Sequence, residues 1–145
     1  MCLRRSLPTV LLALAWAACV PNERPFTSGG PSPRVPVLYT HTYLRADSAG
    51  LPALVDHVGT HWFAMDSLAA ADGLLGRYRL LRNAAAEPRT WDLIVEVGYY
   101  TPVGYEDIAE AFEAIREEYL SRYPEAASLE GLGRFIRSES VGVVP

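Results

Sequence analysis

The chain has 145 residues and a formal net charge of −4, with half of its residues apolar and 21% charged. These totals are typical of one soluble globular domain, which we expect to follow a leader and a linker. Because the chain has no excess of basic residues, it lacks the charge that neutralises phosphates, and we expect no nucleic-acid partner.

The segment 1–18 has the pattern of an export signal. Arg4 and Arg5 form a charged start, and the apolar run Leu7–Ala18 follows them. This run matches the core of a signal peptide and is shorter than the ~20 apolar residues that a membrane-spanning helix needs. We therefore expect residues 1–18 to be a signal peptide that is removed on export.

The next segment, residues 19–34, is rich in proline, glycine and serine and is predicted to be a disordered tether. It opens with Cys19, which would be an unpaired thiol after loss of Cys2 with the leader. Ala17-Ala18-Cys19 resembles a bacterial lipobox, which implies lipid attachment at Cys19 and membrane contact through that anchor only. The predicted location is the bacterial cell envelope, facing the periplasm. Ordinary signal cleavage after Ala17 is the alternative, and it would give a secreted or periplasmic soluble protein.

The predicted folded domain covers residues 35–140. Its first strand is Val35–Arg45, which is rich in β-branched and aromatic residues. A turn at 47–50 leads into a helix from about residue 51 to Asp72. Apolar residues with three- and four-residue spacing predict one continuous helix with a single buried stripe. The stripe consists of Leu51, Leu54, Val55, Val58, Trp62, Met65 and Ala69.

The rest of the domain completes two halves that match in outline, each with a strand, a helix and a strand. The patterns predict strands at Leu74–Leu81 and Trp91–Tyr99, a helix at Tyr105–Arg122, a strand at Arg134–Ser140 and a C-terminal tail, 141–145. The order strand, helix, strand, strand, helix, strand predicts an α+β fold of the split β-α-β type. In this fold, one antiparallel four-stranded sheet has both helices on one face.

The strand Trp91–Tyr99 assigns the two sheet faces. Its apolar face belongs under the helices and consists of Trp91, Leu93, Val95, Val97 and Tyr99. The opposite face carries Ile94 and Glu96, with either Arg77 and Arg79 or Gly76 and Tyr78 from the neighbouring strand. Such a mixture of charged and apolar groups suits a cavity between two packed sheets better than bare solvent. We therefore expect a homodimer.

Three segments, 62–66, 78–81 and 91–99, are similar to a group of bacterial proteins without a known activity. Over residues 35–140 the chain resembles the dimeric α/β-barrel superfamily. Its members are ferredoxin-like βαββαβ domains that pair two sheets into a barrel, and they include cofactor-free antibiotic-biosynthesis-type monooxygenases and small haem-degrading enzymes. The resemblance implies the fold and a dimer, but no single catalytic motif carries over to this chain.

The candidate ligand-binding residues are His41, Tyr43, Arg79 and Glu96. His41 lies in the middle of its strand and faces either the helices or the open sheet face, because both faces of that strand mix polar and apolar groups. Glu96 needs a partner, which Arg77 or Arg79 could supply. We favour a cross-strand ion pair or dimer contact over a base with a raised pKa in a cavity.

His57 and His61 are secondary candidates, because two histidines four residues apart on a helix can reach one metal ion or one ligand. No third ligand lies near them in the sequence, so we predict no metal site and favour packed or solvated side chains. Trp62 and Trp91 are interpreted as core anchors.

The sequence contains no phosphate-binding glycine loop, no nucleophile elbow and no paired-cysteine metal motif, and we expect no cofactor. The leading hypothesis is an exported, lipid-anchored barrel domain that binds a small apolar or aromatic ligand. The alternatives are a cofactor-free monooxygenase or haem-handling enzyme, and a purely structural dimerisation module. Whether the protein is an enzyme stays open at this point.

Overall fold

The computed structural model describes residues 34–85 and 89–144. The predicted signal peptide 1–18, the lipid-attachment residue Cys19 and nearly all of the predicted tether lie outside these residues. Within the described part of the chain, no helix is both long enough and apolar enough to cross a membrane.

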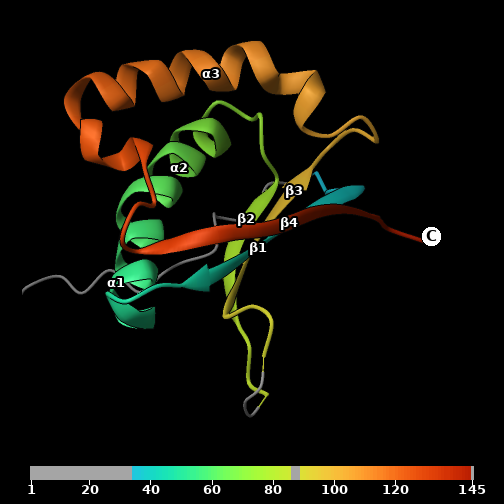
Figure 1. Ribbon diagram of the computed structural model, residues 1–145. Helices are drawn as coiled ribbons and strands as arrows, with labels where there is room; N and C mark the ends of the chain where they lie inside the picture. The colour runs from blue at the N-terminus through green and yellow to red at the C-terminus, as the bar shows by residue number, and fades with distance from the viewer. Residues whose placement is uncertain (1–33, 86–88, 145) are drawn as a thin grey trace, which may run out of the picture.

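The described chain contains four strands and three α-helices, with one π-helical and one 3-10 segment. In order they are β1 (Leu38–Ala46), α1 (Gly50–His57), η1 (π, Val58–Trp62), α2 (Phe63–Ala71), β2 (Arg77–Arg82), β3 (Leu93–Tyr99), α3 (Tyr105–Arg122), η2 (3-10, Pro124–Ala127) and β4 (Gly133–Gly142). The strands form one antiparallel sheet in the order β2-β3-β1-β4, and the helices cover one face of it (Figure 1). The predicted α+β class and ferredoxin-like βαββαβ arrangement are confirmed.

The element boundaries differ from the predictions mainly at strand ends. β1 begins at Leu38 rather than Val35 because Pro36 has no N–H for the ladder, although the N–H of Val37 still bonds to Tyr99. The last strand continues to Gly142, into the predicted tail. Helix α3 has the predicted bounds, and it starts after Gly104, whose φ of 77° suits a residue without a side chain.

The first long helix is not one continuous α-helix, as the apolar spacing predicted. A π-helical turn, η1, separates α1 from α2, and the N–H of Phe63 donates to the carbonyl of Val58, five residues earlier. The extra residue in this turn places Phe63 in the core, 8% exposed, at the position that α-helical spacing assigned to Trp62. Trp62 is partly buried and packs against the outside of the same cluster.

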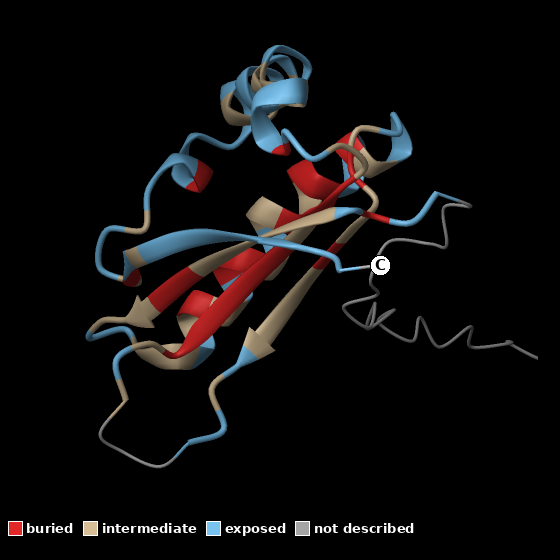
Figure 2. Ribbon diagram, turned by 90° about the vertical axis from the view of Figure 1, so that its right-hand side faces the viewer, coloured by how far each residue is buried: buried red, intermediate tan, exposed pale blue. Residues whose placement is uncertain are grey.

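The core lies between the sheet and the helices, in two clusters. The first consists of Leu44, Leu54, Val58, Phe63, Tyr78, Leu93 and Val95, and the second of Ala69, Leu75 and Tyr99. Helix α3 packs against the second cluster with half-buried side chains and has no fully buried residue. Figure 2 shows the burial concentrated on the central strands and the adjoining helix, whereas the outer helix and the edge strand β4 are largely exposed. The layer under α3 is therefore less tightly filled than the layer under α2.

Trp91 is not the core anchor that the sequence suggested. It precedes β3, is half-buried and belongs to neither core cluster. Its ring meets the ring of Tyr43 edge-on, with centroids 5.4 Å apart. The prediction was wrong because it extended the alternation of β3 two residues beyond the start of the strand.

Candidate functional site

Four polar side chains lie in one row across the sheet. The register pairs Arg79 of β2 with Glu96 of β3, Glu96 with His41 of β1, and His41 with Glu139 of β4. Directly paired residues of antiparallel strands share a face, so all four occupy the face that the helices leave uncovered, which we call the open face. Sequence parity had left the side of His41 undecided, and the register settles it.

The same register selects between the two alternatives for β2. Arg77 and Arg79 belong to the open face, whereas Tyr78 points into the core and is 8% exposed. The Nε atom of Arg77 is buried and has no hydrogen-bond partner within the described residues. Such unsatisfied buried donors are uncommon in folded proteins, and they point to a missing acceptor.

Glu96 is the centre of the row. Only 5% of it is exposed, and its Oε1 accepts the Nε–H of Arg79 at 2.5 Å. Its Oε2 accepts a second bond from Arg79 at 3.0 Å and lies 2.9 Å from Nε2 of His41. Burial alone would raise the pKa of Glu96, but the hydrogen bonds from Arg79 and His41 outweigh it and hold the pKa below its ordinary value. The proposed cross-strand ion pair is therefore present, and the alternative of a raised-pKa base is wrong.

Glu96 orients the two groups that it binds. When Nε2–H of neutral His41 donates to Glu96, the Nδ1 atom of His41 is left as a hydrogen-bond acceptor. The bonds to Glu96 use two of the five N–H donors of Arg79, whose side chain is 41% exposed. One acceptor and one guanidinium edge are thus fixed on the open face, on either side of Glu96.

Tyr43 forms an aromatic wall beside this row. Its hydroxyl donates to Glu139, and the guanidinium carbon of Arg137 lies 3.9 Å from the centre of its ring. The bond to the Glu139 carboxylate raises the pKa of Tyr43, because it stabilises the protonated phenol. Tyr43 is 7% exposed, and its contacts with Glu139 and Arg137 hold its ring in place.

One end of the open face is covered by the chain that leads into β1. A Cβ atom placed on Gly98 would lie 2.9 Å from Pro36 and 2.9 Å from the ring of Tyr39. Glycine is needed there because these two rings pack directly on the backbone. The accessible part of the open face is consequently the half that contains His41 and Arg79.

The secondary candidates, His57 and His61, make contacts typical of packed residues. Their ring centres are 5.0 Å apart, and Nδ1 of His61 lies 3.2 Å from the hydroxyl of Tyr119 on α3. His57 is 8% exposed, and burial, followed by the nearby His61, lowers its pKa. Among the described residues, no group of three or more histidine, cysteine, aspartate or glutamate side chains could hold a metal ion. His61 thus helps to join the π-helical turn to α3.

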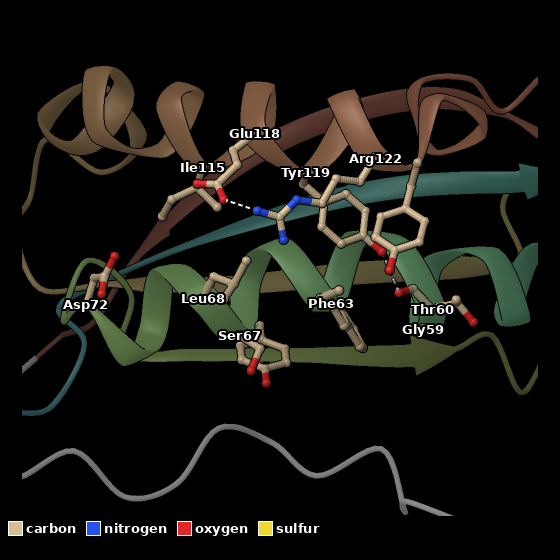
Figure 3. A pocket seen from close by; sticks show the side chains of 13 residues that line it. Gly59, Thr60, Phe63, Ser67, Leu68, Asp72, Ile115, Glu118, Tyr119 and Arg122 are labelled. Atoms are coloured by element: carbon tan, nitrogen blue, oxygen red, sulfur yellow. Dashed lines mark hydrogen bonds and ion pairs between the residues drawn. The ribbon is translucent and has the colours of Figure 1, made fainter.

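Figure 3 shows a groove between α2 and α3 that the sequence did not indicate. Its volume is about 730 Å³, and its walls carry Phe63, Ser67 and Leu68 from α2 and Ile115, Tyr119 and Arg122 from α3. Arg122 pairs with Glu118 on the same helix, and Tyr119 donates to the carbonyl of Thr60 across the groove. The groove is open to solvent, and these two contacts occupy the polar groups of Arg122, Glu118 and Tyr119.

A smaller cavity, about 270 Å³, lies between the sheet, α2 and α3, and it contains a buried carboxylate, Asp66. Asp66 is 7% exposed, and burial raises its pKa to about 7. Asp66 was not among the predicted site residues, although its position in the sequence carried a signal. It lies four residues after Trp62 and three before Ala69, on the stripe predicted to face the core.

Comparisons with protein-family models, with curated proteins and with solved structures returned no match. The class of the protein therefore rests on its own geometry. It is a small α+β domain with the strand order and helix placement of a ferredoxin-like fold.

Proposed function

We propose that this protein is an exported, lipid-anchored member of the dimeric α/β-barrel superfamily that binds a small ligand between two paired sheets. In this proposal the open faces of two copies face each other, and His41, Tyr43, Arg79 and Glu96 contribute to the ligand-binding wall. The fold and strand order support the superfamily assignment, because the helices of the described residues cover only one face of this sheet (Figure 1).

One observation carries the proposal: Glu96 is 5% exposed at the centre of a sheet face that no helix covers. An ordinary solvent-facing sheet surface keeps its charged side chains mobile, because fixing a long side chain costs roughly 1 to 2 kcal/mol of conformational entropy. Here Arg79 and His41 are fixed by Glu96 before any ligand arrives. Such preorganisation is characteristic of binding sites, because it lowers the entropy that binding must overcome.

The chemistry of the open face favours an aromatic or apolar acid. Three arginines, Arg77, Arg79 and Arg137, share this face with two glutamates, although the whole chain carries a net charge of −4. Guanidinium groups bind carboxylates well, and Arg79 has N–H donors beyond the two that bond to Glu96. The rings of Tyr43 and Trp91 would lie against the apolar body of the ligand.

Benzoate is a suitable probe, with benzyl alcohol as its uncharged counterpart. Calorimetric titration of the purified protein should show benzoate binding, weakened roughly tenfold or more by Arg79→Gln. Arg82→Gln is the matched control, because Arg82 is an exposed arginine at the end of the same strand. Equal benzoate affinity in the wild-type protein and in Arg79→Gln would contradict the proposed site.

The oligomeric state needs its own measurement. Light scattering coupled to size exclusion should give the mass of a dimer, and Val141→Glu should shift it toward the monomer. The register pairs Val141 of β4 with Tyr39, so its side chain belongs to the open face, and it is 44% exposed. A monomer at all accessible concentrations would contradict the paired-sheet part of the proposal.

One observation favours a second candidate, a cofactor-free enzyme that uses His41 as its base. The bond from His41 Nε2 to a buried carboxylate is the arrangement that fixes the tautomer of a catalytic histidine. This candidate predicts that an acidic aromatic ligand, once identified, is slowly consumed by the wild-type protein and not by His41→Asn. Unchanged ligand after prolonged incubation would leave the binding function alone.

The membrane anchor is a separate part of the proposal and rests on the sequence pattern around Cys19. Cys19→Ala should move the protein from the membrane fraction of the producing bacterium to the soluble fraction. Ser28→Ala, in the same predicted tether, is the control and should leave the distribution unchanged. Retention of Cys19→Ala on the membrane would overturn the lipoprotein assignment.

A further inference from the structure

The cavity around Asp66 lies on the helix-covered side of the sheet, away from the open face. Its walls are mostly apolar and include Trp62, Met65, Leu75, Val95, Val97, Tyr99 and Phe112. Ala126 and Ala127 of η2 close one end. The cavity is thus bounded by α2 and the π-helical turn, by the central strands and by α3, the most loosely packed of these elements.

Asp66 is 7% exposed, and burial raises its pKa with no hydrogen bond from a described residue to oppose the shift. Buried carboxylates in proteins are nearly always paired or hydrogen-bonded, because an isolated buried charge is strongly disfavoured. The apolar cavity therefore lacks one specific component, a hydrogen-bond donor or a cation next to Asp66.

The nearby polar side chains direct their groups elsewhere. Arg116 also lines the cavity, but its guanidinium pairs with Glu113 at 3.0 Å and the side chain is 44% exposed. The hydroxyl of Tyr105 donates to the same Glu113 at 2.5 Å. Tyr99 shares a hydrogen bond with Thr40. The described protein groups leave Asp66 available to a ligand.

The walls select the kind of ligand. The faces of Trp62, Tyr99 and Phe112 attract cations through the negative charge of their π systems, and a carboxylate among aromatic rings is a recurrent way to bind ammonium groups. A volume of about 270 Å³ is below the usual range for drug-sized ligands, so the occupant has a body no larger than one aromatic ring.

We propose that this cavity is a binding site for a small organic amine, whose ammonium group pairs with Asp66 while its apolar body packs against the aromatic walls. The site is independent of the proposed ligand site on the open face, because the two lie on opposite faces of the sheet. The cavity opens to solvent beside α3, where Tyr105 and Arg116 line it with partly exposed side chains, so a small ligand can enter there.

Benzylamine is the probe, and benzyl alcohol is its uncharged analogue of nearly equal shape. Calorimetric titration of the purified protein at about pH 8 should show benzylamine binding that is roughly tenfold or more weaker in Asp66→Asn. Asp72→Asn is the control, because Asp72 is an exposed carboxylate at the end of the same helix and lines the other groove. The affinity of Asp72→Asn for benzylamine should equal that of the wild-type protein.

Three results would overturn the proposal. The first is no binding of benzylamine to the folded wild-type protein, and the second is equal binding to Asp66→Asn. The third is benzyl alcohol binding as tightly as benzylamine, because the cavity would then be merely apolar. A direct readout of contact is the ¹³C signal of the Asp66 carboxyl group, which should shift on addition of benzylamine and stay unmoved with benzyl alcohol.

A second variant tests the proposal if Asp66→Asn disturbs the fold. Val97→Phe fills the cavity from β3 and leaves the carboxylate in place, so it should also abolish benzylamine binding. Thermal unfolding would establish that each variant is folded. Benzoate binding at the open face should survive both substitutions, so failure of this site and failure of the proposed function give different results.

Discussion

Glu96 and Asp66 are two almost completely buried carboxylates on opposite sides of the sheet, and they behave in opposite ways. Glu96 on the open face is 5% exposed, and Asp66 on the helix side is 7% exposed. The pKa of Glu96 lies below its ordinary value, whereas that of Asp66 is raised to about 7. Similarly low exposure therefore does not give the two groups the same pKa. Asp66 is surrounded more deeply by protein, and only Glu96 has hydrogen bonds from Arg79 and His41 to hold it ionised.

The sheet supplies those partners on one face only. Cross-strand pairing places Arg79 and His41 directly beside Glu96, one on each side, at distances suited to hydrogen bonds. Asp66 projects from α2 toward a layer that α3 does not fill, and no described side chain completes its hydrogen bonds. The strand register thus determines the neighbours of a residue in a sheet. The neighbours of a residue on a helix depend instead on how closely the next layer of the fold packs against that helix.

The largest expected effect comes from removing the paired carboxylate. Glu96→Gln leaves the Arg79 guanidinium and His41 without a counter-charge, and we expect the free energy of unfolding to fall by about 2 kcal/mol. This value is below the usual loss for a fully buried pair, because the Arg79 side chain is 41% exposed and partly screened by solvent. Urea unfolding at neutral pH measures the loss. Glu117→Gln on the exposed side of α3 is the control, and an equal effect in both variants would show that the pairing is unimportant.

Removing the unpaired carboxylate of Asp66 should instead raise the free energy of unfolding at alkaline pH. Because the pKa of Asp66 rises on folding from 3.8 to about 7, the wild-type protein loses stability as the pH rises through that interval, and the loss is complete above it. Asp66→Asn removes the buried charge and should be more stable than the wild type by about 1 kcal/mol near pH 8, after allowance for the buried amide. The advantage should disappear near pH 4.

Thermal unfolding as a function of pH measures this difference. The contribution of Glu96 runs in the other direction, because its stabilisation is present above its ordinary pKa of 4.5 and is lost as the pH falls through the lower folded value. An Asp66→Asn variant with the same pH dependence as the wild type would show that Asp66 has a partner or is exposed to water.

The smallest expected effect concerns His41, which supplies one of the three hydrogen bonds to Glu96. His41→Leu should lower the free energy of unfolding by about 0.5 kcal/mol, because Arg79 still satisfies both oxygens of Glu96. Urea unfolding beside Glu96→Gln gives the comparison. A loss as large as that of Glu96→Gln would mean that His41, and not Arg79, is the main partner.

Sequence patterns predicted the surroundings of Glu96 on the sheet better than those of Asp66 on the helix. Alternation along β3 placed Glu96 on the open face, and the neighbouring strand limited its partner to Arg77 or Arg79. The side of His41 could not be predicted, because both faces of β1 mix polar and apolar residues and only the pairing with Glu96 decides between them.

On the helix side, periodicity gave the bounds of α3 but could not reveal the π-helical turn, because a pattern based on 3.6 residues per turn has no place for an extra residue. Asp66 was missed because a charged residue on a helix normally faces water, and the incomplete packing under α3 depends on the positions of whole elements. Trp91 was misplaced because the alternation of a strand says nothing about residues before the strand begins.

The most direct test is to measure the pKa values of Glu96 and Asp66 in the same sample, by following their ¹³C carboxyl signals through a pH titration. We expect Glu96 to titrate below its ordinary value of 4.5 and Asp66 to titrate at about 7. Ordinary values for both groups, or the reverse order, would contradict the view that one carboxylate is paired by the sheet while the other awaits a ligand.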